Sequence, residues 1–364
     1  MLLDGVIGGL IALLLAGLFT PLFRRIAQRL KLMDCSGGRK WHGTPIPSVG
    51  GLIIISSIIL PLLLFSELTP TMIGLIVGGG LIIGLGIIDD IKGVRYYFKF
   101  AVQFLAVVLF LVISGHQAKP FTIVGFTLDL GYLYYPLIVI WMTGIMNAIN
   151  LIDGLDALAG GVSFIILAVF SLLLYLGSHT GGFLVSIIMA GATLGFLRGN
   201  LPPARVFLGD TGSLFLGFII GSLSVICGVQ NGDAYLVTVP VLVLSLPVLD
   251  TLYVMTYRIS QNKNPFLSDR NHIHHVLLRL GIPGKHVVLI IYSMTLSFCI
   301  LASLSTTLHD GLTILLFFSL ALLAILLPRL QPALRPSVIG RIFPLVNIRF
   351  ASSILKILRL PSGQ

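Results

Sequence analysis

The feature that most constrains the fold of this sequence is a succession of eleven apolar stretches, each long enough, or nearly so, to cross a bilayer. A hydrocarbon core about 30 Å thick takes a helix of about 20 residues, and helix is the expected form because open strands would leave backbone groups unpaired in lipid. Hydrophobic residues make up 56% of the 364 positions and charged residues 10%, a balance foreign to soluble domains. We predict an all-α integral membrane protein. Its spans are expected near residues 3–23, 47–66, 71–88, 99–115, 135–150, 158–177, 181–198, 213–229, 235–257, 286–307 and 311–328.

Lysine and arginine are distributed unevenly among the loops between these stretches. The odd-numbered loops, counted from the N-terminus, and the C-terminal tail hold 22 of the 23 basic residues, and the even-numbered loops hold only Lys119. By the positive-inside rule the odd loops and the C-terminus are cytoplasmic, and the N-terminus is outside. The first stretch has no basic residue before it and Arg24 and Arg25 directly after it. We therefore expect an anchor inserted N-out and not a cleaved signal peptide.

The chain divides by composition into a polytopic transmembrane domain, residues 1–330, and a basic cytoplasmic tail, residues 331–364, in which an interfacial helix is expected. The net charge of +10 follows mostly from the bias of the loops and from attraction to anionic lipid. The bilayer is therefore an expected partner and nucleic acid is not.

The scarce carboxylates gather at the ends of the apolar stretches, on the predicted cytoplasmic side. Insertion scales penalise an Asp at the centre of a membrane helix by roughly 2.5–3.5 kcal/mol, so such residues are expected to be rare and functional. A one-sided group of them predicts a metal and phosphate site at a membrane face. Seven of the 13 acidic residues belong to this group: Asp89, Asp90, Asp153, Asp156, Asp210, Asp250 and Asp269.

The pair Asp89 and Asp90 ends the third stretch. Two adjacent carboxylates repel each other, so holding them together at a helix end needs a cation or a nearby base. A divalent metal would supply that charge, and basic residues at 92, 95 and 99 offer phosphate contacts. The alternative is a stop-transfer junction whose acids sit in headgroup water.

The fifth stretch runs into a polar segment with Asn147, Asn150 and Asp153 at spacings of three, which we interpret as one helical stripe. Gly154 allows a break that turns Asp156 toward the same site. Amides and carboxylates together suit a hard cation or the hydroxyls and phosphates of a nucleotide sugar. Simple helix capping is the alternative.

The seventh loop contains Asn200 and ends in Gly-Asp-Thr-Gly-Ser at 209–213. Glycines beside Asp210 let backbone N–H groups approach an anion, and the following helix presents its positive N-terminal end. Asp210 is thus predicted to ligate Mg²⁺ facing a pyrophosphate, because Mg²⁺ is usually held by one or two carboxylates and substrate oxygens. Capping of the eighth span by Asp210 or Ser213 is the alternative.

The ninth span and loop carry a further polar group. Asp250 lies about two turns inside the span, where a role between helices and a role in the reaction are both open. The loop holds Arg270 with His272, His274 and His275, which read as a clamp for pyrophosphate or nucleotide. A zinc site is the competing idea, but no cysteine or HExxH spacing supports it. A solvated polar loop is the remaining alternative.

In this order, four of these motifs resemble those of the polyprenyl-phosphate N-acetylhexosamine-1-phosphate transferases, glycosyltransferase family 4. They are Asp-Asp at 89–90, Asn-x-x-Asn-x-x-Asp-Gly-x-Asp at 147–156, Gly-Asp-x-Gly-Ser at 209–213 and His-x-His-His at 272–275. The resemblance covers nearly the whole chain. The histidine loop looks like the branch that starts O-antigen, enterobacterial common antigen and teichoic acid linkage units. It differs from the sister enzymes that take the muramyl-pentapeptide nucleotide.

The resemblance implies transfer of a sugar 1-phosphate, foremost GlcNAc 1-phosphate, from a UDP-N-acetylhexosamine to undecaprenyl phosphate, with release of UMP. This would be the first membrane step of a cell-envelope polysaccharide, in the bacterial cytoplasmic (inner) membrane. Mg²⁺ is the implied cofactor, with Mn²⁺ as the alternative, and a homodimer is a further expectation.

The family's residue roles carry over to matching positions of this chain. Asp210 would ligate Mg²⁺, whereas Asp89 and Asp90 would hold the lipid phosphate or the metal and are candidate bases. The nucleotide-sugar pocket at the reaction centre would be formed by Asn150, Asp153 and Asp156. Contacts with phosphate or sugar would come from Lys99, Asn200, Arg270, His272, His274 and His275.

Two positions depart from the family pattern. Many members have a further Asp where this chain has Gly93, and a usual Gly after Asp156 is replaced by Ala157, which we interpret as a packing change.

Two functions of other classes compete with the transferase. An ion-coupled transporter would place its carboxylates near the membrane midplane, often in repeated halves, whereas these lie at one face and no repeat is visible. A non-catalytic lipid-binding or scaffold protein would need the basic loops but neither the Gly-Asp-x-Gly-Ser nor the histidine motif. We predict the transferase.

Overall fold

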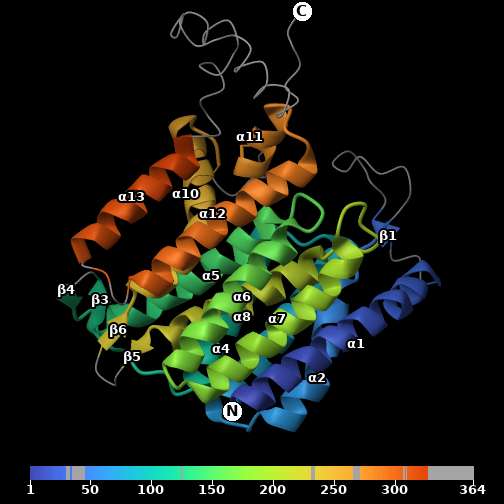
Figure 1. Cartoon of the computed structure of the whole chain (residues 1–364), viewed down its shortest axis with the longest axis horizontal. Helices are drawn as coiled ribbons and strands as arrows, with labels where there is room; N and C mark the ends of the chain where they lie inside the picture. Colours follow the sequence, from blue (N-terminus) through green and yellow to red (C-terminus); the bar gives the residue numbers. More distant parts are fainter. Residues whose placement is uncertain are drawn as a thin grey trace, which may run out of the picture.

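The computed structural model describes residues 1–29, 33–34, 46–123, 126–230, 234–264, 271–305, 308 and 310–326, and these ranges are mostly helical (Figure 1). The predicted tail, 331–364, and Arg270 lie outside them. The helices are α1 (Leu2–Arg29), α2 (Gly50–Phe65), α3 (Pro70–Lys92), α4 (Tyr96–Ile113), η1 (Gly131–Leu133), α5 (Tyr134–Ile152), α6 (Leu158–Leu176), α7 (Thr180–Asn200), α8 (Gly209–Cys227), α9 (Thr238–Val243), α10 (Ser245–Ser260), α11 (Ile273–Arg279), α12 (Gly284–Leu304) and α13 (Asp310–Leu326).

Several of these helices are suited to a bilayer. Within the described ranges, eight are long and apolar enough to cross a membrane: α1, α3, α4, α5 with its leading turn, α6, α7, α8 and α12. The protein is therefore a multi-pass membrane protein built from helices. Two shorter apolar helices, α2 and the core of α13, coincide with two further predicted spans. The full number of eleven spans and their orientation stay predictions.

The stretch predicted as one helix over 235–257 is interrupted. Its first residues belong to strand β6 (Ala234–Leu236), α9 ends at Val243 and α10 begins at Ser245. Pro247 lacks an N–H, and its ring clashes with the carbonyl of the residue four positions earlier, which is Val243. The ninth predicted span is therefore two helical pieces.

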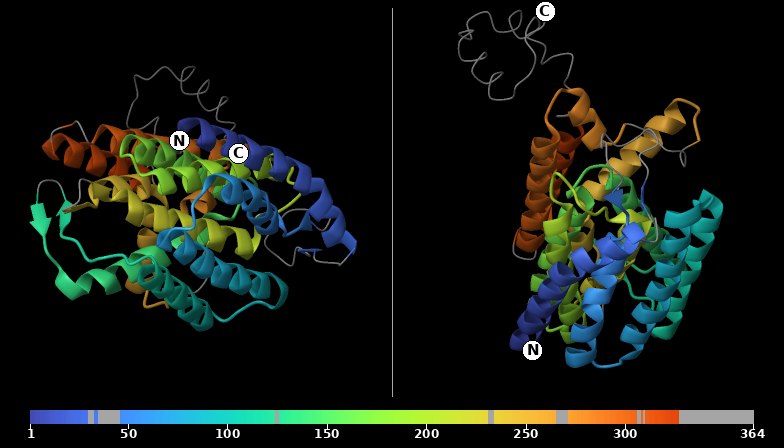
Figure 2. Two further views of the ribbon diagram at one scale, coloured as in Figure 1. Left: turned by 90° about the horizontal axis from the view of Figure 1, so that it is seen from below. Right: turned by 90° about the vertical axis from the view of Figure 1, so that its right-hand side faces the viewer.

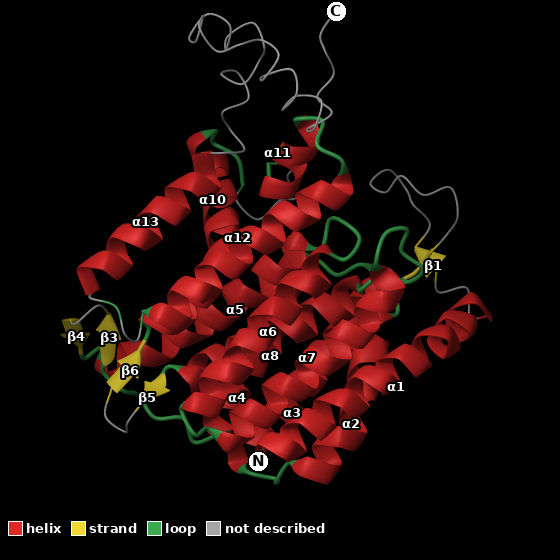
Figure 3. Ribbon diagram, in the orientation of Figure 1, coloured by secondary structure: helices red, strands yellow, loops and turns green. Residues whose placement is uncertain are grey.

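Two small sheets, which the sequence analysis did not predict, connect the helices. β1 (Met33–Asp34) pairs antiparallel with β2 (Ile46–Pro47). Four more strands, in the order β4–β3–β6–β5, gather at one edge of the molecule (Figure 3). They are β3 (Phe121–Ile123), β4 (Phe126–Leu128), β5 (Val229–Gln230) and β6; β3 and β6 are parallel, and the other pairs are antiparallel. The all-α prediction therefore describes the long apolar helices but not these connections.

Helix α8 is the central element of the bundle, packed against α2, α3 and α5, with nearly all of its residues buried. Helices α1 and α13 lie on opposite sides of the bundle in Figure 1, and the right-hand view of Figure 2 shows α3 and α4 on the side opposite α13. A Cβ atom at Gly86 of α3 would overlap the backbone of Thr211, and one at Gly51 of α2 would overlap Gly212. Small residues allow membrane helices to approach this closely. The ends of α2 and α3 are thereby brought onto the first turn of α8.

Candidate active site

Four of the predicted site residues gather around Asp210 at the first turn of α8: Asp89, Asp90, Lys99 and Asn150. This helix begins at Gly209, four residues before the predicted span, so Asp210 lies inside the helix and not in the preceding loop. Its N-cap residue is Leu208, and no side chain of the cap residue bonds to the helix. The alternative in which Asp210 or Ser213 caps α8 is therefore not what the structure shows.

The anion at this helix end is the carboxylate of Asp90, at the end of α3. It accepts hydrogen bonds from the N–H of Asp210 at 2.8 Å, the N–H of Thr211 at 3.0 Å and the Thr211 hydroxyl at 2.6 Å. The first N–H groups of a helix have no partner within it and carry the positive end of its dipole. Gly209 has a φ of 76°, and a Cβ there would lie 3.0 Å from both Asp90 oxygens. Glycine therefore allows both the positive φ at position 209 and the close approach of the Asp90 carboxylate.

Asp89 turns to a different partner, the ammonium of Lys99 at the start of α4, with which it forms an ion pair. The Asp89 side chain is 3% exposed and also accepts the N–H of Val94 at 2.7 Å. Lys99 Nζ lies 3.6 Å from Asp210 Oδ2 as well. Repulsion between the adjacent carboxylates is thus offset by a lysine for one and a helix end for the other. Burial of Asp89 rules out the reading in which both acids sit in headgroup water.

Asp210 is presented between α4 and α5. The side-chain amide of Asn150 donates to Asp210 Oδ1 at 2.5 Å and to Ser213 Oγ at 2.8 Å. Asn147 instead donates to Gln103 of α4 at 2.7 Å. The predicted stripe fails here because each step of three residues turns a helix by about 300°, so the positions drift around it. Of the two asparagines, Asn150 is the one that reaches the site.

The turn that follows α5 is fastened to the loop between α7 and α8. Asp153 is the half-buried C-cap of α5, and Asp156 Oδ2 accepts the N–H of Ala204 at 3.1 Å. Asn200, which is 4% exposed, accepts the N–H of Ala157 at 2.9 Å and donates to the carbonyl of Val206 at 2.8 Å. In this structure Asn200 therefore joins two backbone segments of the site.

The histidine loop is anchored by Asp250 of α10. Its carboxylate accepts the N–H of Ile273 at 2.8 Å and contacts His272 Nδ1 at 2.8 Å. A carboxylate of this kind only accepts, so Nδ1–H is the donor, which in the neutral ring leaves Nε2 as an acceptor. The His272 Nε2 atom is buried without a hydrogen-bond partner in the described part of the chain. Asp250 thus positions the start of α11, a role that the sequence left open.

His274 brings this loop to the turn after α5. Its ring lies against Gly154, where a Cβ atom would overlap Nε2. His274 is 1% exposed, and His275 packs on it at a ring distance of 4.1 Å. Burial, with the neighbouring histidines, lowers the pKa of His274 to about 3, so its ring is neutral at physiological pH. His274 therefore lies beside the turn that carries Asp153 and Asp156, a contact that the sequence does not predict.

Comparison with known proteins gives the same family that these motifs resemble. Residues 72–228 match the family described as glycosyl transferase family 4. A probable undecaprenyl-phosphate N-acetylglucosaminyl 1-phosphate transferase of Bacillus subtilis is 36% identical over 319 residues, covering 86% of this chain and 88% of the relative. The chain belongs to glycosyl transferase family 4.

Two further relatives are less similar to this chain than the Bacillus subtilis protein. The undecaprenyl-phosphate alpha-N-acetylglucosaminyl 1-phosphate transferase of Thermotoga maritima is 33% identical over 283 residues, or 78% of this chain and 84% of the relative. A phospho-N-acetylmuramoyl-pentapeptide-transferase of Clostridium beijerinckii is 28% identical over 317 residues, or 81% and 93%. These names specify no O-antigen or lipopolysaccharide, so that part of the expectation gains no support.

Ala157, where this chain departs from the family 4 pattern, has a backbone conformation that favours glycine. Ala157 has a φ of 66°, in the left-handed region that costs a residue with a Cβ roughly 1–2 kcal/mol. Its N–H is bonded to Asn200, and its carbonyl accepts the hydroxyl of Tyr292 at 2.5 Å. The backbone conformation therefore favours the usual glycine, and the alanine methyl group of this chain is buried at the turn, so the interpretation as a packing change stays a prediction. Gly93, the other departure, ends α3 with a φ of 69°, a common place for glycine.

The residues present fit a magnesium ion better than a closed metal site. In the described ranges, no group of three or more His, Cys, Asp and Glu side chains is placed to hold a metal. Mg²⁺ asks less of the protein, because one or two carboxylates and substrate phosphates suffice. Asp89 is buried against Lys99, and the two Asp90 oxygens accept three hydrogen bonds from α8. The Asp210 side chain is 35% exposed, and among the described residues its Oδ2 has no closer partner than Lys99 Nζ at 3.6 Å, so of these three carboxylates Asp210 has the freest oxygen for a cation.

Proposed function

We propose that this protein transfers an N-acetylhexosamine 1-phosphate, foremost GlcNAc 1-phosphate, from a UDP-sugar to undecaprenyl phosphate and releases UMP. The observation that carries the proposal is the convergence of Asp89, Asp90, Lys99, Asn150 and Asp210 at one end of the bundle. Relatives of similar length, at 36% and 33% identity, are named for transfer from this class of sugar to this class of lipid. A transporter reading lacks the midplane carboxylates that it needs.

The identity of the sugar is supported by the relatives. The relatives from Bacillus subtilis, Thermotoga maritima and Mycobacterium leprae, at 36%, 33% and 32% identity, are named for N-acetylglucosamine, and the Clostridium beijerinckii relative, named for a muramoyl-pentapeptide, is 28% identical. The mycobacterial relatives are named for decaprenyl phosphate, so the length of the prenyl chain rests on the bacillary and Thermotoga names. We assign GlcNAc and undecaprenyl phosphate on this ground.

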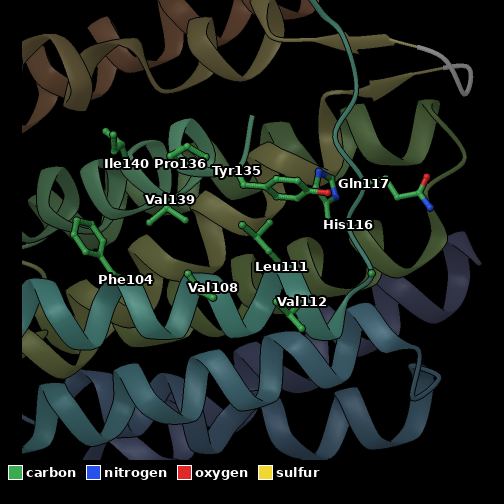
Figure 4. A pocket seen from close by; sticks show the side chains of 11 residues that line it. Phe104, Val108, Leu111, Val112, His116, Gln117, Tyr135, Pro136, Val139 and Ile140 are labelled. Carbon is green, nitrogen blue, oxygen red and sulfur yellow. The ribbon is translucent and has the colours of Figure 1, made fainter. Parts of the chain in front are cut away.

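An apolar groove supports a lipid acceptor. A cavity of about 940 Å³ lies between α4 and α5 (Figure 4). Its lining includes Phe104 and Val108 of α4 and Val139 and Ile140 of α5. Since α4 begins beside Lys99, a phosphate held there would have its prenyl chain directed along the same helix. The groove therefore suits the acceptor's tail.

The chemistry that we propose is direct, in-line attack. A phosphate monoester has a second pKa of about 6, so the prenyl phosphate is already mostly a dianion and needs no general base. One of its oxygens attacks the β-phosphorus of the UDP-sugar, the bond from that phosphorus to the bridging oxygen breaks, and UMP leaves with the bridging oxygen. The main barrier is repulsion between two anions, which positioning and fixed positive charge lower.

Within this scheme, the protein groups have separate tasks. Lys99, between Asp89 and Asp210, supplies fixed positive charge to the phosphates, and Asn150 holds the orientation of Asp210. Asp210 would hold Mg²⁺, or Mn²⁺ in its place, and the ion when bound neutralises charge on the pyrophosphate. His272 Nε2, an acceptor in the neutral ring, is assigned to a hydroxyl or amide N–H of the sugar, and the loop that carries Arg270 is assigned to the donor phosphates.

The site end of the bundle is assigned to the cytoplasm. UDP-sugars are cytosolic, and the basic loops lie on the same side by sequence. The protein is accordingly placed in the bacterial cytoplasmic membrane. Its assembly as a homodimer stays a prediction.

A product assay tests the proposal. Purified protein in detergent, with undecaprenyl phosphate, Mg²⁺ and a panel of UDP-sugars, is expected to give a prenyl-pyrophosphoryl sugar and UMP by mass spectrometry. EDTA and Asp210→Asn should each abolish the product. No product with any UDP-sugar from a folded sample would refute the transferase. Trapping of a phosphorylated Asp89 or Asp90 would refute direct attack.

A further inference from the structure

A second cavity, of about 250 Å³, lies between α1 and α7, and three of the residues that line it are arginines. It is lined by Thr20 and Arg24 of α1, Arg198 and Gly199 of α7 and Arg205 of the following loop. Helices α1 and α7 lie side by side along one flank of the bundle (Figure 1). None of the five residues contacts the carboxylates of the candidate active site, so the cavity is a separate site.

The charge of this cavity is uncompensated. In the part of the chain that the structure describes, Arg24, Arg198 and Arg205 form no ion pair with a carboxylate. Like charges that share a small cavity repel each other, and an anion between them removes that cost. The guanidinium group presents its donors in a fork that matches the oxygens of phosphate. The cavity is therefore suited to a phosphate group.

The walls of the cavity are fixed by close packing of the two helices. A Cβ atom at Gly195 would overlap the carbonyl of Leu13, and one at Gly199 would lie 2.8 Å from the Thr20 methyl. The Thr20 hydroxyl donates to the Ala16 carbonyl at 2.7 Å. These contacts fix the separation of the two helix backbones that carry Arg24 and Arg198.

The neighbouring surface points to a lipid as the source of the phosphate. Leu10, Leu14, Leu18 and Leu22 are spaced by four residues along α1 and are 54%, 68%, 66% and 49% exposed. These side chains show that α1 is an outer helix, and α1 is also apolar and long enough to cross a membrane. Its apolar stretch is followed by Arg24, so a lipid beside α1 would have its headgroup phosphate at the level of the arginine end of this helix.

We propose that Arg24, Arg198 and Arg205 form a binding site for the phosphate of an anionic phospholipid, apart from the reaction centre. The site is connected to the active site through the loop after α7. The N–H of Arg205 donates to the Gly199 carbonyl at 2.8 Å, and the neighbouring Ala204 N–H is the donor to Asp156. A lipid held at Arg205 therefore stabilises the segment that fastens the 153–157 turn.

The experiment compares lipids and variants directly. Native mass spectrometry of the full chain in detergent counts bound dioleoyl-phosphatidylglycerol and dioleoyl-phosphatidylcholine, and thermal unfolding is followed with each lipid and with inorganic phosphate. The wild type is expected to bind and be stabilised by phosphatidylglycerol in preference to phosphatidylcholine. R198Q/R205Q should bind phosphatidylglycerol at least about tenfold more weakly. Arg25→Gln, next to Arg24 but outside the cavity, is the matched control and should behave as wild type.

Three results would overturn the proposal. Equal binding of phosphatidylglycerol by R198Q/R205Q and wild type would remove the arginines from the site. Equal binding of the two lipids by wild type would show that the charge is not recognised. Arginine-dependent stabilisation by inorganic phosphate without any preference for phosphatidylglycerol would assign the cavity to a soluble anion. None of these readouts requires transferase activity, so the two proposals fail separately.

Discussion

The carboxylate of Asp90 accepts the backbone N–H of Asp210 at 2.8 Å, across 120 residues of sequence. The second aspartate of the Asp-Asp pair therefore fixes the helix on which Asp210 stands. Asp89 and Lys99 stabilise the other side of the same junction. The two halves of the motif thus have different tasks, and substitutions should separate them.

Substitution at Asp90 is expected to act on the fold and on activity, whereas substitution at Asp210 acts on activity alone. Asp90→Asn removes the charge from the α8 N-terminus and should lower the free energy of unfolding by about 1–2 kcal/mol. Asp210→Asn keeps an acceptor for Asn150 at a partly exposed position, so the free energy of unfolding of this variant should differ from that of wild type by less than about 0.5 kcal/mol. Its kcat should fall at least about 100-fold. Thermal unfolding in detergent and the product assay check both, and an unfolding temperature unchanged by Asp90→Asn would contradict the anchoring role.

Lys99 is expected to have a structural and a functional role that a double variant can separate. Lys99→Gln leaves Asp89 buried without its counter-charge, which should cost about 3 kcal/mol of stability. Adding Asp89→Asn removes the unpaired charge and should restore most of that loss. Activity should stay low in the double variant, because Lys99 Nζ, 3.6 Å from Asp210, is then missing from the phosphate site. Recovery of both stability and activity would show that Lys99 acts only on the fold.

The sequence supported much of the site because composition and motif order carry long-range information. Polar residues at the end of an apolar stretch are costly in a membrane and are therefore expected to be functional. This argument alone selects Asp89, Asp90, Asn150 and Asp210 from the sequence. The helical form of the long stretches follows from the bilayer itself.

The partners within the site were beyond sequence analysis, because they depend on how distant helices pack. Nothing in the local pattern distinguishes Asn150, which bonds Asp210, from Asn147, which bonds Gln103. Thr211 lay inside a recognised motif, but its hydroxyl bond to Asp90 was not foreseen. Tyr292, in a distant apolar helix, gave no signal at all. The short strands escaped notice because two or three residues carry no measurable periodicity.

Gly154 offers a test of the contact between the histidine loop and the turn after α5. Gly154→Ala places a methyl group where His274 Nε2 lies, so the ring must move. We expect kcat/KM to fall at least about tenfold, with a smaller effect on unfolding. Gly144→Ala in α5 is the matched control, since a Cβ there meets no atom within 4 Å, and it should leave activity unchanged. Wild-type kcat/KM in Gly154→Ala would show that the position of His274 does not matter to the reaction.

His274 also predicts how stability depends on pH. Burial lowers its pKa from 6.5 to about 3, so between these values the unfolded chain binds a proton that the folded chain does not. Stability is therefore fully present above pH 6.5 and is lost as the pH falls toward 3. From pH 7.5 to 5.5 this single group should remove about 1.4 kcal/mol.

Variants isolate this contribution from that of the other titrating groups. Thermal unfolding in detergent is measured at pH 7.5, 6.5 and 5.5. As the pH falls, the stability of His274→Asn should decline less than that of wild type, by about 1.4 kcal/mol between pH 7.5 and 5.5. The exposed His286 provides the control, and His286→Asn should follow the wild-type curve. Equal declines for His274→Asn and wild type would mean that His274 takes up a proton in the folded protein, which the absence of a hydrogen-bond partner for either ring nitrogen among the described residues argues against.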